Sequence, residues 1–153
     1  MRSATFALLA LTGCAAVSTD APSAPVAQGP SPAEIVATRQ AAFNLTAATF
    51  ASMRAAVESG AEVKPLAFGA RGLNRWAQAL PAMFPPGTQL PQSKARASVW
   101  EDRPGFEARA AAFQSATAQL AAAAQAGDKA AFATAYKATG AACGACHSGY
   151  RAE

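Results

Sequence analysis

The stretch Cys143-Gly144-Ala145-Cys146-His147 constrains this 153-residue chain more than any other part of its sequence. Its pattern, C-x-x-C-H, is typical of covalent attachment of a c-type haem. If the stretch is helical, Cys143 lies three residues before Cys146 and four before His147, so the three side chains share one helix face. The two thiols can then add to the two vinyl groups of one porphyrin, while the imidazole ligates its iron. The motif therefore predicts one covalently bound haem c with His147, the only histidine in the chain, as axial ligand.

Other uses of this motif fit less well. A structural zinc site has four ligands, whereas two cysteines and one histidine gather here. A thioredoxin-like redox pair accompanies a βαβ pattern, and the chain shows no convincing strand. A disulfide between Cys143 and Cys146 stays open as an alternative, although it leaves the adjacent His147 without a purpose.

The composition favours helices and argues against two classes of partner. Hydrophobic residues make up 52% of the chain, and much of that share is alanine, the strongest helix former. The formal charge of +4 falls to about +3 without Arg2, and two haem propionates would offset most of it, so the charge does not indicate nucleic-acid binding. No run of 18 apolar residues predicts a membrane-spanning helix in the mature protein.

Residues 1–13 have the features of an export signal, with Arg2 as a minimal basic region before an apolar stretch. The signal ends in Leu-Thr-Gly-Cys14, which resembles the lipobox of bacterial lipoproteins. That resemblance implies cleavage before Cys14, its acylation, and contact with the membrane only through the lipid. The alternative is an ordinary signal peptide cut near Ala21 or Ala24, which leaves a soluble protein. Both interpretations predict a periplasmic location.

Residues 14–30 are rich in alanine, proline and serine and lack periodicity, which indicates a flexible tether. The folded part, 31–153, begins with a helix start signal. Ser31 can cap the helix, Pro32 suits its first position, and Glu34 completes a capping box. Gly60 is expected to end this first helix.

Three further amphipathic segments follow, at about 65–80, 104–126 and 129–150, with a long loop over 81–94. Gly127 ends the third and Asp128 caps the fourth. The sequence therefore predicts an all-α fold, an antiparallel four-helix bundle with the haem near the C-terminal end of the fourth helix. The expected inward positions are Phe43, Thr46, Phe50, Met53, Val57, Leu66, Leu73, Trp76, Leu80, Phe106, Ala110, Phe113, Thr117, Leu120, Ala124, Phe132, Tyr136, Thr139, Cys143, Cys146 and Tyr150.

Several short motifs of the chain recur together in one known family. They are Arg39-Gln40 in the first helix, Trp100 before the third helix, and Cys143-Gly-Ala-Cys-His147-Ser-Gly-Tyr150-Arg151 at the end. With them the chain resembles the class II c-type cytochromes, the cytochrome c′ family, over about residues 35–151. The family is built of four-helix bundles with C-x-x-C-H near the C-terminus.

The resemblance implies a role for each of six residues. Cys143 and Cys146 would carry the haem, and His147 would be its proximal ligand. Arg39 would pair with a haem propionate, and Phe43 would face the distal side of the iron. Arg151 would lie beside the proximal imidazole.

The chain departs from the family pattern in two places. Gly144 stands where many members have lysine. Low-spin members place a methionine at or near the position of Phe43, and phenylalanine has no lone pair with which to ligate iron. Met53 lies ten residues further on, about 15 Å along a helix, so it should miss the iron. We therefore expect a five-coordinate, high-spin iron.

The leading functional prediction is a periplasmic haem protein that binds a small diatomic gas, nitric oxide or carbon monoxide. The alternative is an electron-transfer cytochrome between periplasmic redox partners, which would prefer a sixth ligand that the chain does not evidently offer. Enzymatic turnover of peroxide lacks a distal acid–base residue, so we do not expect an enzyme. The sequence leaves open whether the bundle is a monomer or a homodimer formed through apolar surface on the first two helices.

Overall fold

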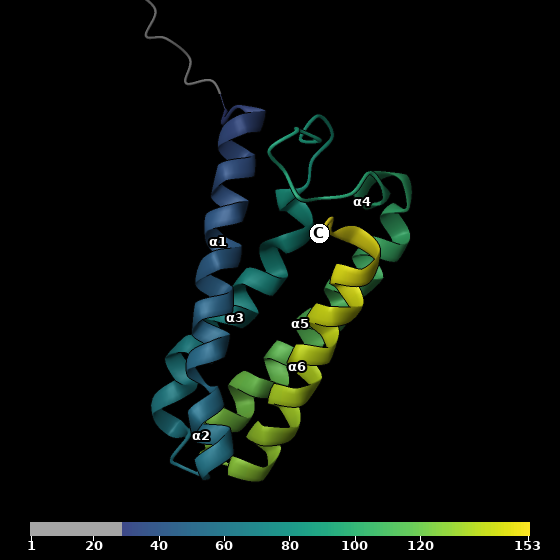
Figure 1. The fold of residues 1–153 in the computed structure, drawn as a ribbon. Coiled ribbons are helices and arrows are strands. Elements are labelled where there is room, and N and C mark those ends of the chain that lie inside the picture. Colours follow the sequence, from purple (N-terminus) through teal and green to yellow (C-terminus); the bar gives the residue numbers. More distant parts are fainter. Residues whose placement is uncertain (1–28) are drawn as a thin grey trace, which may run out of the picture.

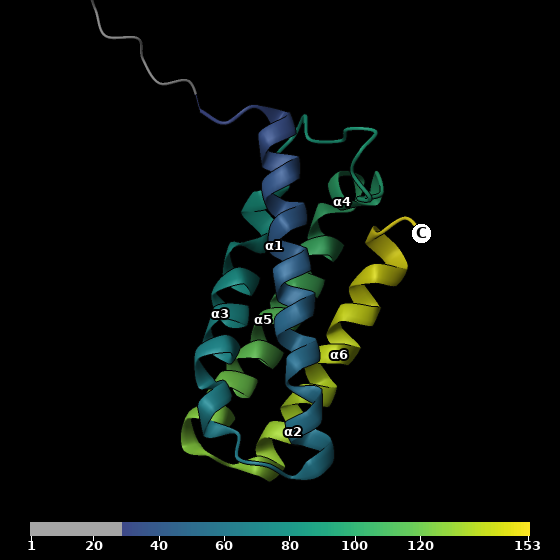
Figure 2. The same cartoon turned by 60° about the vertical axis from the view of Figure 1, so that its left-hand side comes forward.

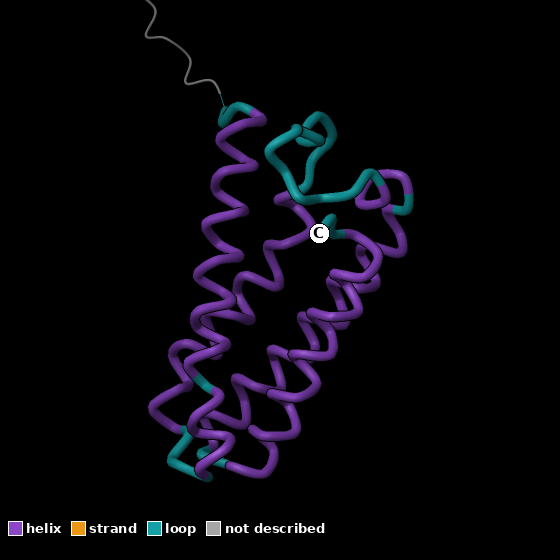
Figure 3. Tube along the Cα trace, in the orientation of Figure 1, coloured by secondary structure: helices purple, strands orange, loops and turns teal. Residues whose placement is uncertain are grey.

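The computed structural model describes residues 29–153, and the predicted signal, Cys14 and nearly all of the tether lie outside the described residues. Four long helices dominate, and they confirm the predicted all-helical four-helix bundle (Figure 1). Short α-helical and 3-10 segments and the loops join them, mostly at the two ends of the bundle (Figure 3). The order is α1 (Pro32–Ser52), α2 (Arg54–Ser59), η1 (Lys64–Leu66), α3 (Ala67–Ala79), η2 (Leu80–Met83), α4 (Ser98–Glu101), α5 (Arg103–Ala126) and α6 (Lys129–Tyr150).

The helix α5 is central to the packing, because both α3 and α6 lie against it. The helix α1 packs on α3 and meets α6 near one end of the bundle, where the rings of Phe50 and Tyr136 stack 4.2 Å apart. Towards the end that carries the long loop, α1 and α6 lie apart (Figures 1 and 2). The bundle is therefore closed at the end that carries the turn between α5 and α6, here called the turn end, and splayed at the end that carries the long loop, here called the loop end.

The predicted helix boundaries have the expected local chemistry. The Ser31 hydroxyl accepts a hydrogen bond from the amide of Glu34, and the Ser31 amide donates to the Glu34 carboxylate at 2.7 Å, which completes the capping box. Gly60 (φ 66°) and Gly127 (φ 75°) adopt the left-handed conformation that ends a helix. The Asp128 side chain caps α6 through the amide of Ala131.

The prediction of one continuous helix from Ser31 to Gly60 was wrong in one detail. The helix is interrupted at Met53, where the Ser52 hydroxyl donates to the Thr49 carbonyl and the Met53 amide bonds the Phe50 carbonyl three residues back. Such local bonds compete with the regular helical ladder. The second predicted helix starts as a 3-10 turn around Pro65, and the short α4 was not expected.

The buried side chains form two clusters. The turn-end cluster contains Met53, Leu73, Leu120 and Phe132, among others, and the loop-end cluster contains Leu80, Phe84, Val99, Phe106 and Phe113, among others. The inward positions predicted for the third helix are confirmed as core, since all of them are buried: Phe106, Ala110, Phe113, Thr117, Leu120 and Ala124. The loop-end cluster lies beside the splayed helices.

Two large apolar side chains are strongly exposed, Leu45 of α1 at 70% and Phe68 of α3 at 82%. They lie on the first two long helices, the expected location of a dimer surface, and the homodimer stays a prediction. None of the helices in residues 29–153 combines the length and apolar character that a membrane crossing requires.

Candidate haem site

A cavity of about 720 Å³ occupies the splayed end of the bundle. Its volume falls within the range of about 300–1,000 Å³ that cofactor and ligand pockets have. The helices α1, α3, α5 and α6 contribute to its wall, together with residues 92–95 of the long loop. Cys143, Cys146 and His147 all line this one cavity.

The motif lies in the last turns of α6, so its predicted helical conformation is confirmed. Cys143 and Cys146 are half-buried, and His147 is exposed at the rim. A Cβ added at Gly144 would meet open space, with no atom within 4 Å. Helical spacing therefore brings both thiols and the imidazole to the same cavity.

The environment keeps the three reactive groups uncharged. Burial raises the pKa of the Cys143 thiol, and the neighbouring Cys146 raises it further. Burial also raises the pKa of Cys146, against an opposing effect of Arg109. Burial lowers the pKa of His147, and the positive charge of Arg151 lowers it further. At neutral pH the imidazole thus keeps the lone pair that an iron ligand needs.

Phe43 enters the cavity from α1, whereas the motif enters it from α6. The edge of its ring meets Trp76 with the centroids 5.2 Å apart, and Phe84 lies 6.4 Å away. Phe43 and Phe84 line the cavity with apolar rings that carry no hydrogen-bond donor, whereas Trp76 packs against Phe43 without lining the cavity itself.

Arg39 is 2% exposed, and its guanidinium is held by the long loop. One terminal nitrogen donates to the Met83 carbonyl and to the Thr88 hydroxyl, at 3.2 and 2.8 Å. The other donates to the Thr88 carbonyl and to Ser93 Oγ, at 2.9 and 2.7 Å. These four bonds use all the N–H groups of the two Nη atoms. The sequence analysis did not predict that Arg39 anchors the long loop. Pairing of Arg39 with a haem propionate stays a prediction, and the Nε–H group is the donor that remains for it.

Arg151 lines the cavity next to the motif, in the first position after α6. Its amide donates to the His147 carbonyl at 3.2 Å, and its backbone pairs with Ala95 in an isolated antiparallel bridge. The side chain is exposed. Arg151 and His147 line the same cavity, and the position of Arg151 beside the imidazole stays a prediction.

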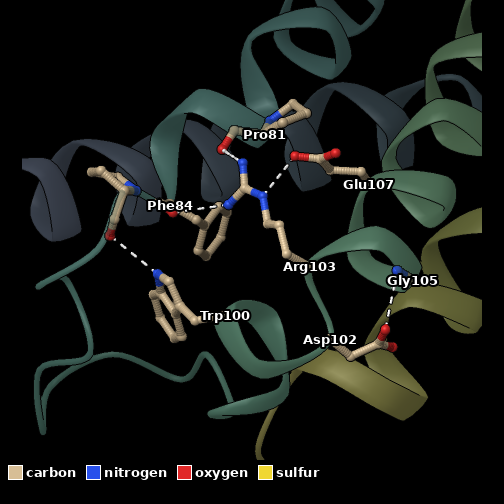
Figure 4. A network of polar contacts seen from close by, with 8 residues as sticks. Pro81, Phe84, Trp100, Asp102, Arg103, Gly105 and Glu107 are labelled. Atoms are coloured by element: carbon tan, nitrogen blue, oxygen red, sulfur yellow. Dashed lines mark hydrogen bonds and ion pairs between the residues drawn. The ribbon is translucent and has the colours of Figure 1, made fainter.

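A second network fixes Phe84, a cavity residue that the sequence analysis did not select (Figure 4). Arg103 donates to the carbonyls of Phe84 and Pro81, at 3.0 and 2.8 Å, and to the Glu107 carboxylate. The indole of Trp100 donates to the Pro85 carbonyl at 3.1 Å. The sequence around Phe84 belongs to a loop and has no periodicity, so no pattern indicates that this residue lines the cavity.

Asp102 and Arg109 were also missed. Asp102 caps α5 by accepting from the Gly105 amide, and a helix start signal was available, because an aspartate precedes Arg103 and Pro104. Arg109 lines the cavity from α5 and carries no local signal that distinguishes it from a surface arginine.

The groups that line the cavity fit a covalently attached haem. Two thiols and one neutral imidazole on one helix face match the requirements of thioether attachment and axial ligation. Within residues 29–153 no group of three or more histidine, cysteine, aspartate or glutamate side chains is arranged so that it could hold a bare metal ion.

Comparisons with known proteins agree with this donor set. The sequence model of the family described as cytochrome c′ matches residues 34–151. The cytochrome c′ of Rhodospirillum rubrum is 32% identical over 130 residues, which are 84% of this chain and 88% of the relative.

Solved structures show the same likeness in three dimensions. Cytochrome c′ of Rubrivivax gelatinosus superposes with a TM-score of 0.74 at 31% identity, over 81% of this chain and 99% of the other. A ferrous variant of the Alcaligenes xylosoxidans cytochrome c′ with bound nitric oxide gives 0.75 at 31% identity, over 82% and 99%. A carbon monoxide-bound variant of that protein gives 0.75 at 32% identity, over 82% and 100%. Cytochromes c′ are haem proteins and not enzymes, and this chain belongs to the cytochrome c′ family.

Proposed function

We propose that the chain is a periplasmic haem c protein that binds a diatomic gas, nitric oxide or carbon monoxide. The thiols of Cys143 and Cys146 hold the cofactor covalently, and the His147 imidazole is the single protein ligand of the iron. A bound haem supplies an iron with an open coordination position, to which a diatomic gas can bind. The observation that carries this proposal is that one cavity is lined by Cys143, Cys146 and His147 and, from another helix, by Phe43.

The cavity wall supports a five-coordinate, high-spin iron. Within residues 29–153 its lining contains no methionine and no second histidine. Met53 is buried in the turn-end cluster, and Met83 packs against the loop-end cluster without lining the cavity. The lack of a second ligand is also the reason why we place electron transfer second, since a six-coordinate iron would reorganise less.

The relatives support the choice of ligand. Variants of the Alcaligenes xylosoxidans cytochrome c′ have been solved with nitric oxide and with carbon monoxide. The aromatic wall around Phe43 offers contact surface to an apolar diatomic molecule. The choice between the two gases is an outcome of the measurement below.

The attachment is tested by acid–acetone extraction of the purified protein. We expect the haem to stay with the polypeptide, whose mass then includes one haem. The variant in which Cys143 and Cys146 are both alanine should lose the covalent cofactor. Recovery of free haem from the wild type in the organic phase would contradict thioether attachment.

The gas site is tested by absorption spectra of the ferric and ferrous protein, with and without each gas. We expect high-spin spectra in both oxidation states and a new ferrous spectrum when nitric oxide or carbon monoxide is added. Low-spin spectra in both states, unchanged by either gas, would favour the electron-transfer alternative.

The boundaries before residue 31 rest on the sequence alone. We propose an export signal over 1–13, acylation of Cys14 and a tether over 14–30 that precedes the bundle of 31–153. Mass spectrometry of the mature protein tests this proposal, because an acylated product begins at Cys14 and carries lipid. A soluble product that begins after residue 20 supports the ordinary signal peptide instead.

A further inference from the structure

The end of α6 is held by a neighbouring segment of chain, residues 94–98. The last carbonyls of a helix have no partner within the helix, but here three of them accept from this segment. Ser148 O accepts from Arg96 Nη1 at 3.2 Å, Gly149 O from Ser98 Oγ at 2.8 Å, and Tyr150 O from the Arg96 amide at 3.0 Å. The turn that follows His147 is thus fixed through its backbone.

The Tyr150 side chain adds a contact of a different kind. Its hydroxyl donates to Asp102 Oδ2 at 2.7 Å, and its ring meets Phe106 edge-on at 5.5 Å. Tyr150 lines the cavity and lies three residues after His147 and four after Cys146, so it shares their helix face. The hydrogen bond to Asp102 raises the pKa of Tyr150, which keeps the hydroxyl protonated as a donor.

Asp102 connects this contact to the start of α5. Its other oxygen, Oδ1, accepts from the Gly105 amide at 3.2 Å (Figure 4). A Cβ at position 105 would collide with the Asp102 carboxylate and lie 2.5 Å from the Tyr150 hydroxyl. Glycine at position 105 therefore leaves the space in which the side chains of Asp102 and Tyr150 meet.

We propose that Tyr150 and Asp102 are positioning residues for His147: their hydrogen bond fixes the last turn of α6 against the first turn of α5 and so sets how the imidazole is presented to the haem iron. This inference rests on the proposed role of His147 as axial ligand. The 94–98 segment holds the same turn through its backbone, but only the Tyr150–Asp102 contact reaches it through a side chain on the face of the motif.

The test is Tyr150→Phe, which removes one hydroxyl and keeps the ring. The readout is the iron–histidine stretching band of the ferrous protein in resonance Raman spectra, because this band reports the geometry of the bond at His147 and not stability. We expect the band to shift or broaden in the variant. The matched control is Tyr136→Phe on the same helix, whose ring stacks on Phe50 and whose hydroxyl makes no hydrogen bond within residues 29–153. The control should leave the band unchanged.

A double-mutant cycle tests whether Tyr150 and Asp102 act on the band through their mutual contact. Asp102→Ala should shift the band as Tyr150→Phe does, and the double variant should shift it no further. Asp102→Asn keeps an oxygen that can accept from the hydroxyl, so it should restore most of the wild-type band. Because Asp102→Ala also removes the cap of α5, its lower melting temperature is expected and does not bear on the inference, which depends on the band.

The inference is overturned if Tyr150→Phe gives the wild-type band, if Tyr136→Phe shifts it as much, or if the two changes in the cycle simply add. The proposed function fails separately, since a wild type without covalent haem or without an iron–histidine band would show that His147 is not the ligand.

Discussion

Phe43 is the residue at which the chemistry of the cavity is most easily altered. Its phenyl ring has neither a donor nor a lone pair, and it packs edge-on against Trp76. It can therefore affect a ligand only by its bulk. A diatomic molecule that binds on this side must displace a packed ring, which costs on the order of 1 kcal/mol or more in lost contacts.

Replacing Phe43 with alanine should speed association of carbon monoxide with the ferrous protein and raise its affinity severalfold, because the packed ring no longer has to move. Flash photolysis and equilibrium titration measure the two quantities. Phe43→Met is the informative second variant, since its thioether can act as a sixth ligand and give a low-spin spectrum. Unchanged rates in Phe43→Ala would place the ligand against another part of the wall.

Single residues also show where sequence reasoning succeeds and where it stops. The motif at 143–147 carries its chemistry in adjacent positions, so helical spacing alone brings its side chains to one face. Arg39 is different, because its hydrogen-bond partners Thr88 and Ser93 lie 49 and 54 residues away in an aperiodic loop. No local pattern predicts such a contact, and the hydrogen bond between Tyr150 and Asp102, 48 residues apart, was missed for the same reason.

At the scale of elements, the helix ends were predictable because caps are local. Ser31, Gly60, Gly127 and Asp128 act at the boundaries where their side chains or backbone preferences indicated them. The interruption at Met53 was not predictable, because a serine that bonds the preceding turn occurs in many uninterrupted helices.

Two glycines in different conformations give opposite predictions. Gly127→Ala should lower the free energy of unfolding by about 1 kcal/mol, because a side chain is unfavourable at its positive φ of 75°. Gly144→Ala should raise it by up to roughly 1 kcal/mol, since the position is helical and a Cβ meets open space. Urea unfolding followed by circular dichroism measures both. Equal changes in the two variants would contradict the assigned conformations.

At the scale of the molecule, the turn-end cluster lies away from the cavity except at Leu73, whereas several members of the loop-end cluster line it. The turn-end cluster contains Phe132, which is fully buried and does not line the cavity. The loop-end cluster contains Phe106, which is 2% exposed and does line it. A substitution at Phe132 should therefore change stability without changing the site.

Phe132→Leu should lower the free energy of unfolding by about 1 kcal/mol, because a smaller side chain leaves part of a packed space unfilled. The haem absorption spectrum and the carbon monoxide association rate should stay as in the wild type. Phe106→Leu, the same change in the other cluster, should alter both as well as stability. A spectrum that changes equally in the two variants would show that the clusters are not separable.

The buried guanidinium of Arg39 has an electrochemical consequence. Burial lowers its pKa, but an arginine stays protonated, and its four partners are neutral oxygens. The ion pairs within residues 29–153 lie elsewhere, at Arg103 and Lys129. A fixed positive charge in the cavity wall disfavours the ferric state, which carries one more positive charge than the ferrous state.

Arg39→Gln should consequently lower the midpoint potential of the haem by on the order of tens of millivolts, the size expected for one charge at an effective dielectric constant of about 20. Arg54→Gln on α2 is the control, because that exposed charge lies on the helix that follows α1 at the turn end and is screened by salt. Spectroelectrochemical titration compares the two variants with the wild type, and equal potentials in all three would show that the iron does not sense the buried charge. If the potential falls in Arg39→Gln alone, the residue that holds the long loop in place also sets how readily the iron gives up an electron.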